Sequence, residues 1–437
     1  ISIITKYNYP NLRESMKHIV VINSSEFSGV ELLDKLLKEK YKVSYFRNLA
    51  YIRDWDSSRT DDVLRRLHNV IDLPNTHTPE IVRDAVGILN DSQPVDALIC
   101  IDDFSLEAAA CAAEHINVPF SSVNAVKTTK NKLLSRQILE GTDKNAPWVI
   151  HERDYHKLPS VLASVELPVI VKPVTSASSR LAYIIKERAQ INLLINNIEE
   201  EINELPSSYT DFFNRGFLVE KYLTGPLVSV EIGRIGNSYY PFMVTSRIRC
   251  ASDNVIELGS VMPSSLNDKE EQECFKLAIS ALDKIGLDNG IFHIEMIYTN
   301  SGPAIVEVNG RLGGRTIPVL YELATGNSMF EHLINISQRA EPKAESVYQG
   351  QKAVSFFFKA EQYGKVLDGT SRALPQNLAS YIQSFEFMKK PGDTLQKGEI
   401  LGWTIVSARQ EEIWNVLHEL IQFVESSSGV EVKKPLI

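Results

Sequence analysis

The sequence has no apolar run that approaches the roughly 18 residues of a membrane-spanning helix. Its first stretch, ISIITKYNYP, lacks the basic region and apolar core of a secretory signal. An excess of positive charge is missing as well, since 46 Lys and Arg stand against 55 Asp and Glu, a formal net charge of -9. We therefore expect neither a general nucleic-acid binder nor a membrane-bound protein.

Cysteine is scarce, and the spacing of the four cysteines includes no CxxC pair of the metal-binding or redox type. Each cysteine lies in an apolar or helical context, which favours a reduced, packed thiol over a metal or redox role. The four are Cys100, Cys111, Cys250 and Cys274. These features predict a soluble, cytoplasmic protein. Because the sequence begins with Ile rather than Met, we also expect that leading residues precede it.

The chain has 437 residues, 43% of them hydrophobic, which is enough for several domains with sizeable cores. Residues 18–46 read as strand, amphipathic helix and strand, and residues 95–122 repeat this order with the strands VDALICI and VPFSS. Two such units predict an open, mostly parallel α/β domain over residues 1–123. Asp102 and Asp103 follow VDALICI, where we favour capping of the next helix over metal binding.

The remaining chain changes pattern twice. Helical patterns at 128–140 and 188–204 enclose short strands, and β-rich segments then alternate with a predicted helix at 268–285. After about residue 340 come more short strands, turn signals at YGKVLDG and KPGDTLQKGE, and an amphipathic helix near 409–425. We predict three further regions, over residues 124–215, 216–340 and 341–437.

An acidic side chain recurs inside two neighbouring apolar runs, IFHIEMIY and PAIVEVN, which flank the turn signal TNSG. Because side chains alternate along a strand, Ile305, Glu307 and Asn309 are predicted to share one face. A three-residue loop over 300–302 would set Glu295 directly opposite Glu307. Like charges in that position destabilise a sheet, so the pattern indicates a cation between them.

Two carboxylates and one amide oxygen are hard ligands of the kind that Mg²⁺ takes together with phosphate oxygens and water. Arg311 lies one step beyond Asn309, where a guanidinium would contact the same phosphates and offset their charge. The alternative is that each Glu forms a structural ion pair, since an ionised carboxylate in an apolar strand needs a partner. His293 shares the face of Glu295, and a single strand histidine is more often packed than catalytic.

These residues resemble the ATP-grasp superfamily, and the order of the other motifs agrees with it over nearly the whole chain. The resemblance implies an ATP-grasp fold of α/β and α+β type, with an N-terminal open α/β (pre-ATP-grasp) domain, a two-lobed nucleotide-binding region and a C-terminal β-rich subdomain. It makes 124–215 the small ATP-covering lobe with its connecting helix, 216–340 the central lobe with the metal hairpin, and 341–437 the closing subdomain with the final helix.

Further motifs carry the resemblance residue by residue. TTKNKLLSRQIL is similar to the helix whose lysine touches phosphate, PVIVKP to the strand with a second phosphate lysine, and GFLVEKYLTG to the adenine-binding hinge. The loop TSASSR stands in the place of the phosphate-covering loop, with Ser and Ala instead of Gly. The implied ATP contacts are Lys132, Lys172, Ser178, Ser179, Glu220, Lys221, Leu223 and, at the ribose, Glu231. The implied ligands of Mg²⁺, or of Mn²⁺, are Glu295, Glu307 and Asn309.

Within the superfamily, NGRLGG and the segment after it resemble the L-amino-acid ligases. The implied reaction joins a small-molecule carboxylate to an amine through an acylphosphate, giving a dipeptide or amide with ADP and phosphate, in a homodimer. Arg311, Gly313 and Gly314 are the implied catalytic residues, and Arg315, Ser260 and His293 the implied substrate contacts. A tight turn is the structural alternative for the two glycines. A biotin-carboxylase-like enzyme, a nucleotide-biosynthesis enzyme and a non-catalytic nucleotide-binding regulator are the alternative functions.

Overall fold

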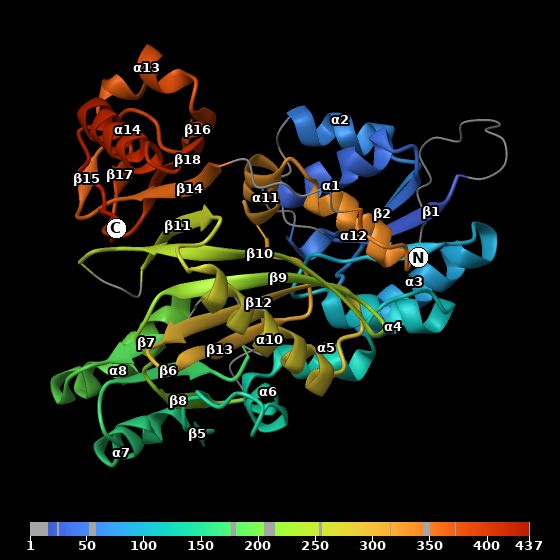
Figure 1. The fold of residues 1–437 in the computed structure, drawn as a ribbon, viewed down its shortest axis with the longest axis horizontal. Coiled ribbons are helices and arrows are strands. Elements are labelled where there is room, and N and C mark those ends of the chain that lie inside the picture. Colours follow the sequence, from blue (N-terminus) through green and yellow to red (C-terminus); the bar gives the residue numbers. More distant parts are fainter. Residues whose placement is uncertain are drawn as a thin grey trace.

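The structure is a computed structural model that describes residues 16–23, 26–51, 58–175, 181–204, 215–252, 256–314, 316–343, 350–371 and 373–436. Its strands form an eight-stranded sheet, two four-stranded sheets and a two-stranded ribbon (Figure 1). Across these residues, each helix is too short or too polar to cross a membrane.

A parallel sheet in the order β3-β2-β1-β4 occupies the N-terminal region, which confirms the predicted α/β arrangement. The strands are β1 (His18–Ile22), β2 (Lys42–Asn48), β3 (Asn69–Leu73) and β4 (Ala97–Ile99). The helices around them are α1 (Glu26–Lys38), α2 (Ser58–Arg66), α3 (Pro79–Ser92) and α4 (Leu106–Ile116), with a 3₁₀ turn at Leu49–Tyr51. Buried apolar side chains of the sheet and helices fill both faces, as a parallel sheet requires.

The predicted strand VPFSS is wrong, because residues 118–122 are irregular and lead into α5 (Val123–Lys130). Ser121 instead exchanges hydrogen bonds with Asn289 at the start of β12, and the Ser122 side chain caps α5. The predicted helix 128–140 is also interrupted, since Asn131 has an extended backbone and its side chain caps α6 (Lys132–Ile138). The segment thus connects the first sheet to the central one.

The small lobe is an antiparallel sheet in the order β5-β8-β6-β7, covered by two helices (Figure 1). The strands are β5 (Val149–Glu152), β6 (Val169–Pro173), β7 (Tyr183–Ile185) and β8 (Phe217–Lys221). The helices are α7 (Leu158–Ala163) and α8 (Arg188–Glu204), with a 3₁₀ turn at Tyr155–Lys157. The bounds of α8 agree with the predicted helix, whose apolar side packs on the sheet.

The central sheet runs in the order β13-β12-β9-β10-β11-β14-β18-β16. Its strands are β9 (Leu227–Ile235), β10 (Ser238–Arg249), β11 (Glu257–Met262), β12 (Asn289–Thr299), β13 (Gly302–Asn309), β14 (Gln351–Lys359), β16 (Ile382–Phe387) and β18 (Ile400–Arg409). On one face of its first strands lies α10 (Asp268–Ile285), which has the predicted bounds and begins with a capping box of Asn267 and Glu270.

The C-terminal strands extend the central sheet, so the predicted boundary near residue 340 falls within one continuous sheet. α11 (Ile317–Thr325) and α12 (Met329–Ser337) join the central lobe to the N-terminal region through a shared core. At the far end, α14 (Ile413–Ser428) packs on β14 and β18. The remaining elements are β15 (Gly364–Lys365), β17 (Thr394–Leu395), α13 (Gln376–Ala379) and a 3₁₀ turn at Asp368–Ser371.

A buried cluster of three charges ties the small lobe to the central hairpin. Glu220 of β8 accepts from Arg136 of α6, at 2.9 Å between Nε and Oε1, and lies 2.7 Å from the Lys172 ammonium of β6. Arg136 also donates to the carbonyl oxygens of Ile305 and Val306 in β13. Burial alone would raise the pKa of Glu220, but Lys172 and Arg136 outweigh it and lower that pKa to about 2.

We predict that Glu220→Gln lowers the free energy of unfolding by about 3–5 kcal/mol at neutral pH, because it leaves two buried cations without their carboxylate. The folded-state pKa of Glu220 lies below its ordinary value of 4.5. Its stabilising effect is therefore complete above that value and is lost as the pH falls toward 2. Urea denaturation across this range should show the difference between wild type and variant shrinking with acidity.

The matched control is Glu419→Gln, at an exposed carboxylate on α14 that accepts from Asn377. It should leave the free energy of unfolding nearly unchanged, because a surface contact contributes little. A difference for Glu220→Gln that stays constant from neutral to acid pH would contradict the ionised cluster.

Candidate active site

Glu295 and Glu307 lie directly opposite each other in the β12–β13 hairpin, as predicted. The predicted loop is wrong, however, since Thr299 pairs with Gly302 and leaves a turn of two residues instead of three. A bulge at Val306 makes up the difference, because Met296 pairs with Ile305 while the next pair is Glu295 with Glu307. The pairing of the two acids was therefore predicted correctly, but from a wrong loop length and without the bulge.

The bulge also reverses the face on which Ile305 lies. Ile305 is 1% exposed and packs against α10, so the prediction that it shares the face of Glu307 and Asn309 is wrong. Arg136 holds the bulged backbone through its two carbonyl oxygens. Glu307 and Asn309 lie on the opposite face of the strand.

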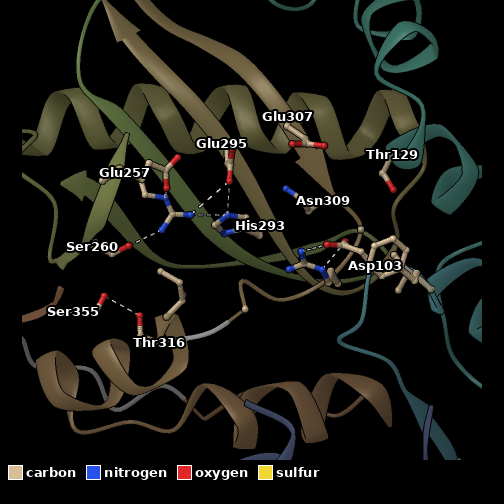
Figure 2. A pocket seen from close by; sticks show the side chains of 18 of the residues that line it. Asp103, Thr129, Glu257, Ser260, His293, Glu295, Glu307, Asn309, Thr316 and Ser355 are labelled. Carbon is tan, nitrogen blue, oxygen red and sulfur yellow. Dashed lines mark hydrogen bonds and ion pairs between the residues drawn. The ribbon is translucent and has the colours of Figure 1, made fainter. Parts of the chain in front are cut away.

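A cavity of about 520 Å³ lies over that face, between the hairpin, the N-terminal region and the strands β11 and β14. Glu295, Glu307 and Asn309 follow one another along the hairpin wall (Figure 2). Asp103 of the N-terminal region closes one side, and Ser260 of β11 lies at the other (Figure 2). The cavity thus brings together side chains from three parts of the sequence.

Each acid of the hairpin lies against a cation. The Lys132 ammonium is 2.8 Å from Glu307 Oε1, which places the predicted phosphate lysine beside a predicted metal ligand. Oε1 of Glu295 is 3.2 Å from His293 Nε2 and 3.6 Å from Arg247 Nη2. Burial would raise the pKa of Glu295, but His293 and Arg247 lower it to about 2. Glu295 is therefore held as a carboxylate opposite Glu307.

Beneath the cavity wall, Glu231 holds His293. The Glu231 carboxylate is fully buried, and its Oε1 lies 2.5 Å from His293 Nδ1. Burial would lower the pKa of His293, but Glu231 raises it to about 9. The Glu231 side chain is thus enclosed and paired with the histidine, and its predicted ribose contact stays a prediction. His293 itself lines the cavity, as its predicted substrate role requires.

The two glycines differ. The N–H of Gly313 points to Glu231 Oε2 at 3.4 Å, and its predicted contact with an acyl oxygen stays a prediction. A Cβ at Gly313 would lie 2.9 Å from His293 Nδ1 and 3.1 Å from Glu231, which explains why glycine is needed there. Gly314 lines the cavity, where its predicted role stays a prediction.

Arg311 lines the cavity, but each of its three guanidinium nitrogens already donates a hydrogen bond. Its Nε donates to Asp103 Oδ1 at 2.6 Å, its Nη2 donates to the other oxygen, and its Nη1 donates to the carbonyl of Leu312 at 2.8 Å. The predicted phosphate contact therefore requires Asp103 to release part of the guanidinium. The predicted capping of α4 by Asp102 or Asp103 is wrong, because Ser105 occupies the N-cap position and Asp102 accepts from the N–H and hydroxyl of Ser105.

Sequence reasoning missed Asp103 as the partner of Arg311, 208 residues away, and missed Arg247. One signal existed for Asp103, because the carboxyl ends of parallel strands are where ligand sites of α/β folds lie. Arg247 lies on β10 beside Ser260, to whose hydroxyl it donates at 2.8 Å. Ser260 is thus brought to the cavity as predicted, with its oxygen engaged by an arginine.

The predicted nucleotide contacts lie mostly outside this cavity. The side chains of Lys172 and Glu220 face each other in the buried cluster, and their predicted contacts with the nucleotide stay predictions. The backbone N–H of Lys221 donates to Trp148, and Leu223 follows the end of β8. Ser178, Ser179 and Arg315 lie outside the described residues.

The donor set of the hairpin suits a cation that brings further ligands of its own. In the described part of the chain, three His, Cys, Asp or Glu side chains do not come together as a ready-made metal cluster. Two carboxylates and the Asn309 amide instead offer oxygen atoms on one rigid hairpin. This set fits Mg²⁺, which takes one or two carboxylates and completes its shell with phosphate oxygens and water.

Comparison with known proteins agrees with this architecture. Residues 165–319 match the ATP-grasp domain family. Alanine–anticapsin ligase of Bacillus subtilis is 20% identical over 313 residues, which cover 69% of this chain and 65% of that protein. The chain thus spans just under two thirds of the length of this curated relative.

Solved structures show the same fold. The L-amino acid ligase from Bacillus licheniformis superposes with a TM-score of 0.74 at 16% identity, over 97% of this chain and 100% of that one. The biotin carboxylase domain of the Hydrogenobacter thermophilus 2-oxoglutarate carboxylase, in complex with MgADP, ADP and bicarbonate, gives 0.66 at 14% identity, over 97% and 92%. The chain therefore contains an ATP-grasp domain and has the ATP-grasp fold, within which it resembles the L-amino-acid ligases.

Proposed function

We propose that this protein is an ATP-dependent, ADP-forming ligase that joins the carboxylate of an amino acid to an amine. The observation that carries the proposal is the pair Glu295 and Glu307, set opposite each other with Asn309 on the wall of a large cavity. Two ionised acids facing each other in a sheet are unfavourable unless cations surround them. The relationship to an alanine–anticapsin ligase supports the choice of substrates.

The residues present could hold a magnesium nucleotide. Glu295, Glu307 and Asn309 would hold Mg²⁺, which would neutralise phosphate charge when bound. Lys132 lies 2.8 Å from Glu307 and would turn from that carboxylate to a phosphate oxygen. Lys172 would do the same from the cluster with Glu220. The MgADP complex of a protein with the same fold supports a nucleotide as ligand.

The proposed reaction has two steps. An oxygen of the substrate carboxylate attacks the γ-phosphorus of ATP, forming an O–P bond as the bond from that phosphorus to ADP breaks. A neutral amine then attacks the acyl carbon, forming a C–N bond, losing a proton and releasing inorganic phosphate. Arg311 and His293 line the cavity in which charge gathers during both steps, and they would stabilise it there.

The biotin-carboxylase-like, nucleotide-biosynthesis and non-catalytic alternatives are less favoured, since the relatives found by sequence include a ligase named for alanine. The choice of Mg²⁺ over Mn²⁺, the homodimer and the cytoplasmic location stay predictions. Arg315, Ser178 and Ser179 keep their predicted roles at the substrate and the phosphates.

We predict that Glu307→Gln lowers ADP formation by about a thousandfold. The variant loses one of the two carboxylates proposed to bind Mg²⁺ and leaves the Lys132 ammonium without its carboxylate partner. The measurement is an ADP-release screen of wild type across pairs of amino acids with Mg-ATP, with mass spectrometry of the product, repeated for the variant. Glu273→Gln is the matched control, because Glu273 lies on α10 behind the sheet and accepts from Tyr298.

Amide product in the wild-type screen, and its loss in Glu307→Gln alone, is the expected result. Unchanged turnover in Glu307→Gln would contradict the metal assignment. Wild-type ADP release without any amide product would contradict the ligase itself.

A second prediction concerns the link between Asp103 and Arg311. Asp103→Asn removes the charge that orients the guanidinium, so kcat should fall about tenfold while KM for ATP stays unchanged. Steady-state kinetics with ATP varied at saturating amino acids measures both constants. An unaltered kcat would show that the pair only joins the N-terminal region to the central lobe.

A further inference from the structure

Arg247 is a buried cation in the cavity wall that takes no part in the proposed metal and phosphate contacts. Its side chain on β10 is 9% exposed, and it lines the cavity together with Glu257, Ser260 and Glu295. Nη1 donates to Ser260 Oγ at 2.8 Å, and Nη2 lies 3.0 Å from His293 Nε2. The hydroxyl of Ser260 thereby holds one end of the guanidinium.

The donors of Arg247 are less completely used than those of Arg311. Asp103 takes both atoms of the Arg311 fork at hydrogen-bond distance. The carboxylates nearest to Arg247 are farther away, with Glu295 at 3.6 Å from Nη2 and Glu257 at 3.7 Å from Nε. Among the described residues, the buried Nε–H of Arg247 has no hydrogen-bond acceptor. A buried N–H without an acceptor is costly, which indicates that a ligand supplies one.

Glu257 is the complementary group. It stands at the start of β11, lines the same cavity, and approaches Arg247 only to 3.7 Å. Figure 2 shows Glu257, Glu295 and Ser260 together at the end of the cavity away from Asp103. At this separation the acid and the arginine attract each other, yet the Nε–H of Arg247 and the Glu257 carboxylate form no short hydrogen bond with each other.

We propose that Arg247 and Glu257 form a subsite for a zwitterion, in which Arg247 binds the carboxylate to be activated and Glu257 binds the α-ammonium of the same molecule. This proposal rests on the ligase function and names the class of its first substrate, an α-amino acid. Adjacent opposite charges recognise such a molecule because its own charges are separated by one carbon atom. Charge-assisted hydrogen bonds at both ends then fix its orientation.

The position of the subsite agrees with the chemistry. Glu295 lies 3.6 Å from Arg247, so a carboxylate on Arg247 is next to the hairpin at which the γ-phosphate is proposed to bind. One carboxylate oxygen forms the bond to phosphorus, and the bond from phosphorus to ADP breaks. The ammonium on Glu257 keeps its three protons and cannot attack. The nucleophile is therefore the neutral amine of a second molecule, which loses the proton when the amide forms.

Binding, rather than turnover, tests the subsite. Each proteinogenic amino acid is titrated calorimetrically into the full chain with Mg²⁺ and a non-hydrolysable ATP analogue. The tightest-binding amino acid is then compared with its desamino analogue, which has the same side chain and carboxylate but a hydrogen in place of the ammonium. We expect the wild type to bind the amino acid at least about tenfold more tightly, since a charged hydrogen bond is lost in the analogue.

Two single substitutions separate the roles of the two charged groups. Glu257→Gln should bring the amino acid to the affinity of its analogue while leaving the analogue unaffected. Arg247→Lys should weaken both about tenfold, because a lysine cannot reproduce the fixed guanidinium fork. Arg47→Lys, at a pair with Asp72 far from the cavity, and Glu273→Gln are the controls. Unchanged affinity for the ATP analogue checks that each variant is folded.

A wild type that binds the desamino acid as tightly as the amino acid would overturn the subsite, as would a Glu257→Gln variant that retains the preference. Absence of binding by every amino acid would also overturn it. The comparison of the amino acid with its desamino analogue, made in the wild type and in Glu257→Gln, tests the subsite even if Arg247→Lys fails to fold. The ligase proposal fails on a different result, the absence of amide product in the wild-type screen, so the two failures are distinguishable.

Discussion

The active-site region depends on one unfavourable contact, the pairing of Glu295 with Glu307 across an antiparallel hairpin. The two carboxylates repel each other, and the surrounding side chains are arranged to oppose that repulsion. Lys132 approaches one acid from α6, while His293 and Arg247 approach the other from β12 and β10. The cavity wall is thus a balanced set of charges that a cationic metal and an anionic phosphate can enter together.

Buried groups behind the wall hold these side chains and the hairpin in place. Glu231 fixes His293 from below, and Gly313 provides the space in which they meet. Arg136 supports the bulge of β13 and shares Glu220 with Lys172, so the hairpin and the small lobe are connected by charge. Asp103 connects the N-terminal region to the same wall through Arg311. The three parts of the chain therefore meet at the site through ion pairs.

Local patterns were enough to predict part of this arrangement. The alternation of IVEVN and the turn signal predicted the hairpin and its opposed acids, and helix periodicity predicted α8 and α10 with their bounds. The bulge at Val306 could not be predicted, because it depends on Arg136, 170 residues away. The partner of Asp103 and the burial of Glu231 are likewise consequences of distant contacts. Arg247 was missed for the same reason, since its meaning comes from Glu257 and Glu295 around it.

The bulge also shows why a correct register is weak support for a predicted loop. Removing one residue from the turn and adding one to the strand leaves the two acids opposite each other, but it turns Ile305 into the core. The strand therefore places two oxygen-bearing side chains in the cavity and none of its apolar ones.

The central claim is that the opposed carboxylates exchange their cationic side chains for a metal when the nucleotide binds. A crystal structure of the protein with MgADP tests it most directly. We expect Mg²⁺ at about 2.0–2.1 Å from oxygens of Glu295 and Glu307, with the Lys132 ammonium moved from Glu307 to a phosphate. An intact pair of Lys132 and Glu307, with the nucleotide's metal bound elsewhere, would contradict the claim.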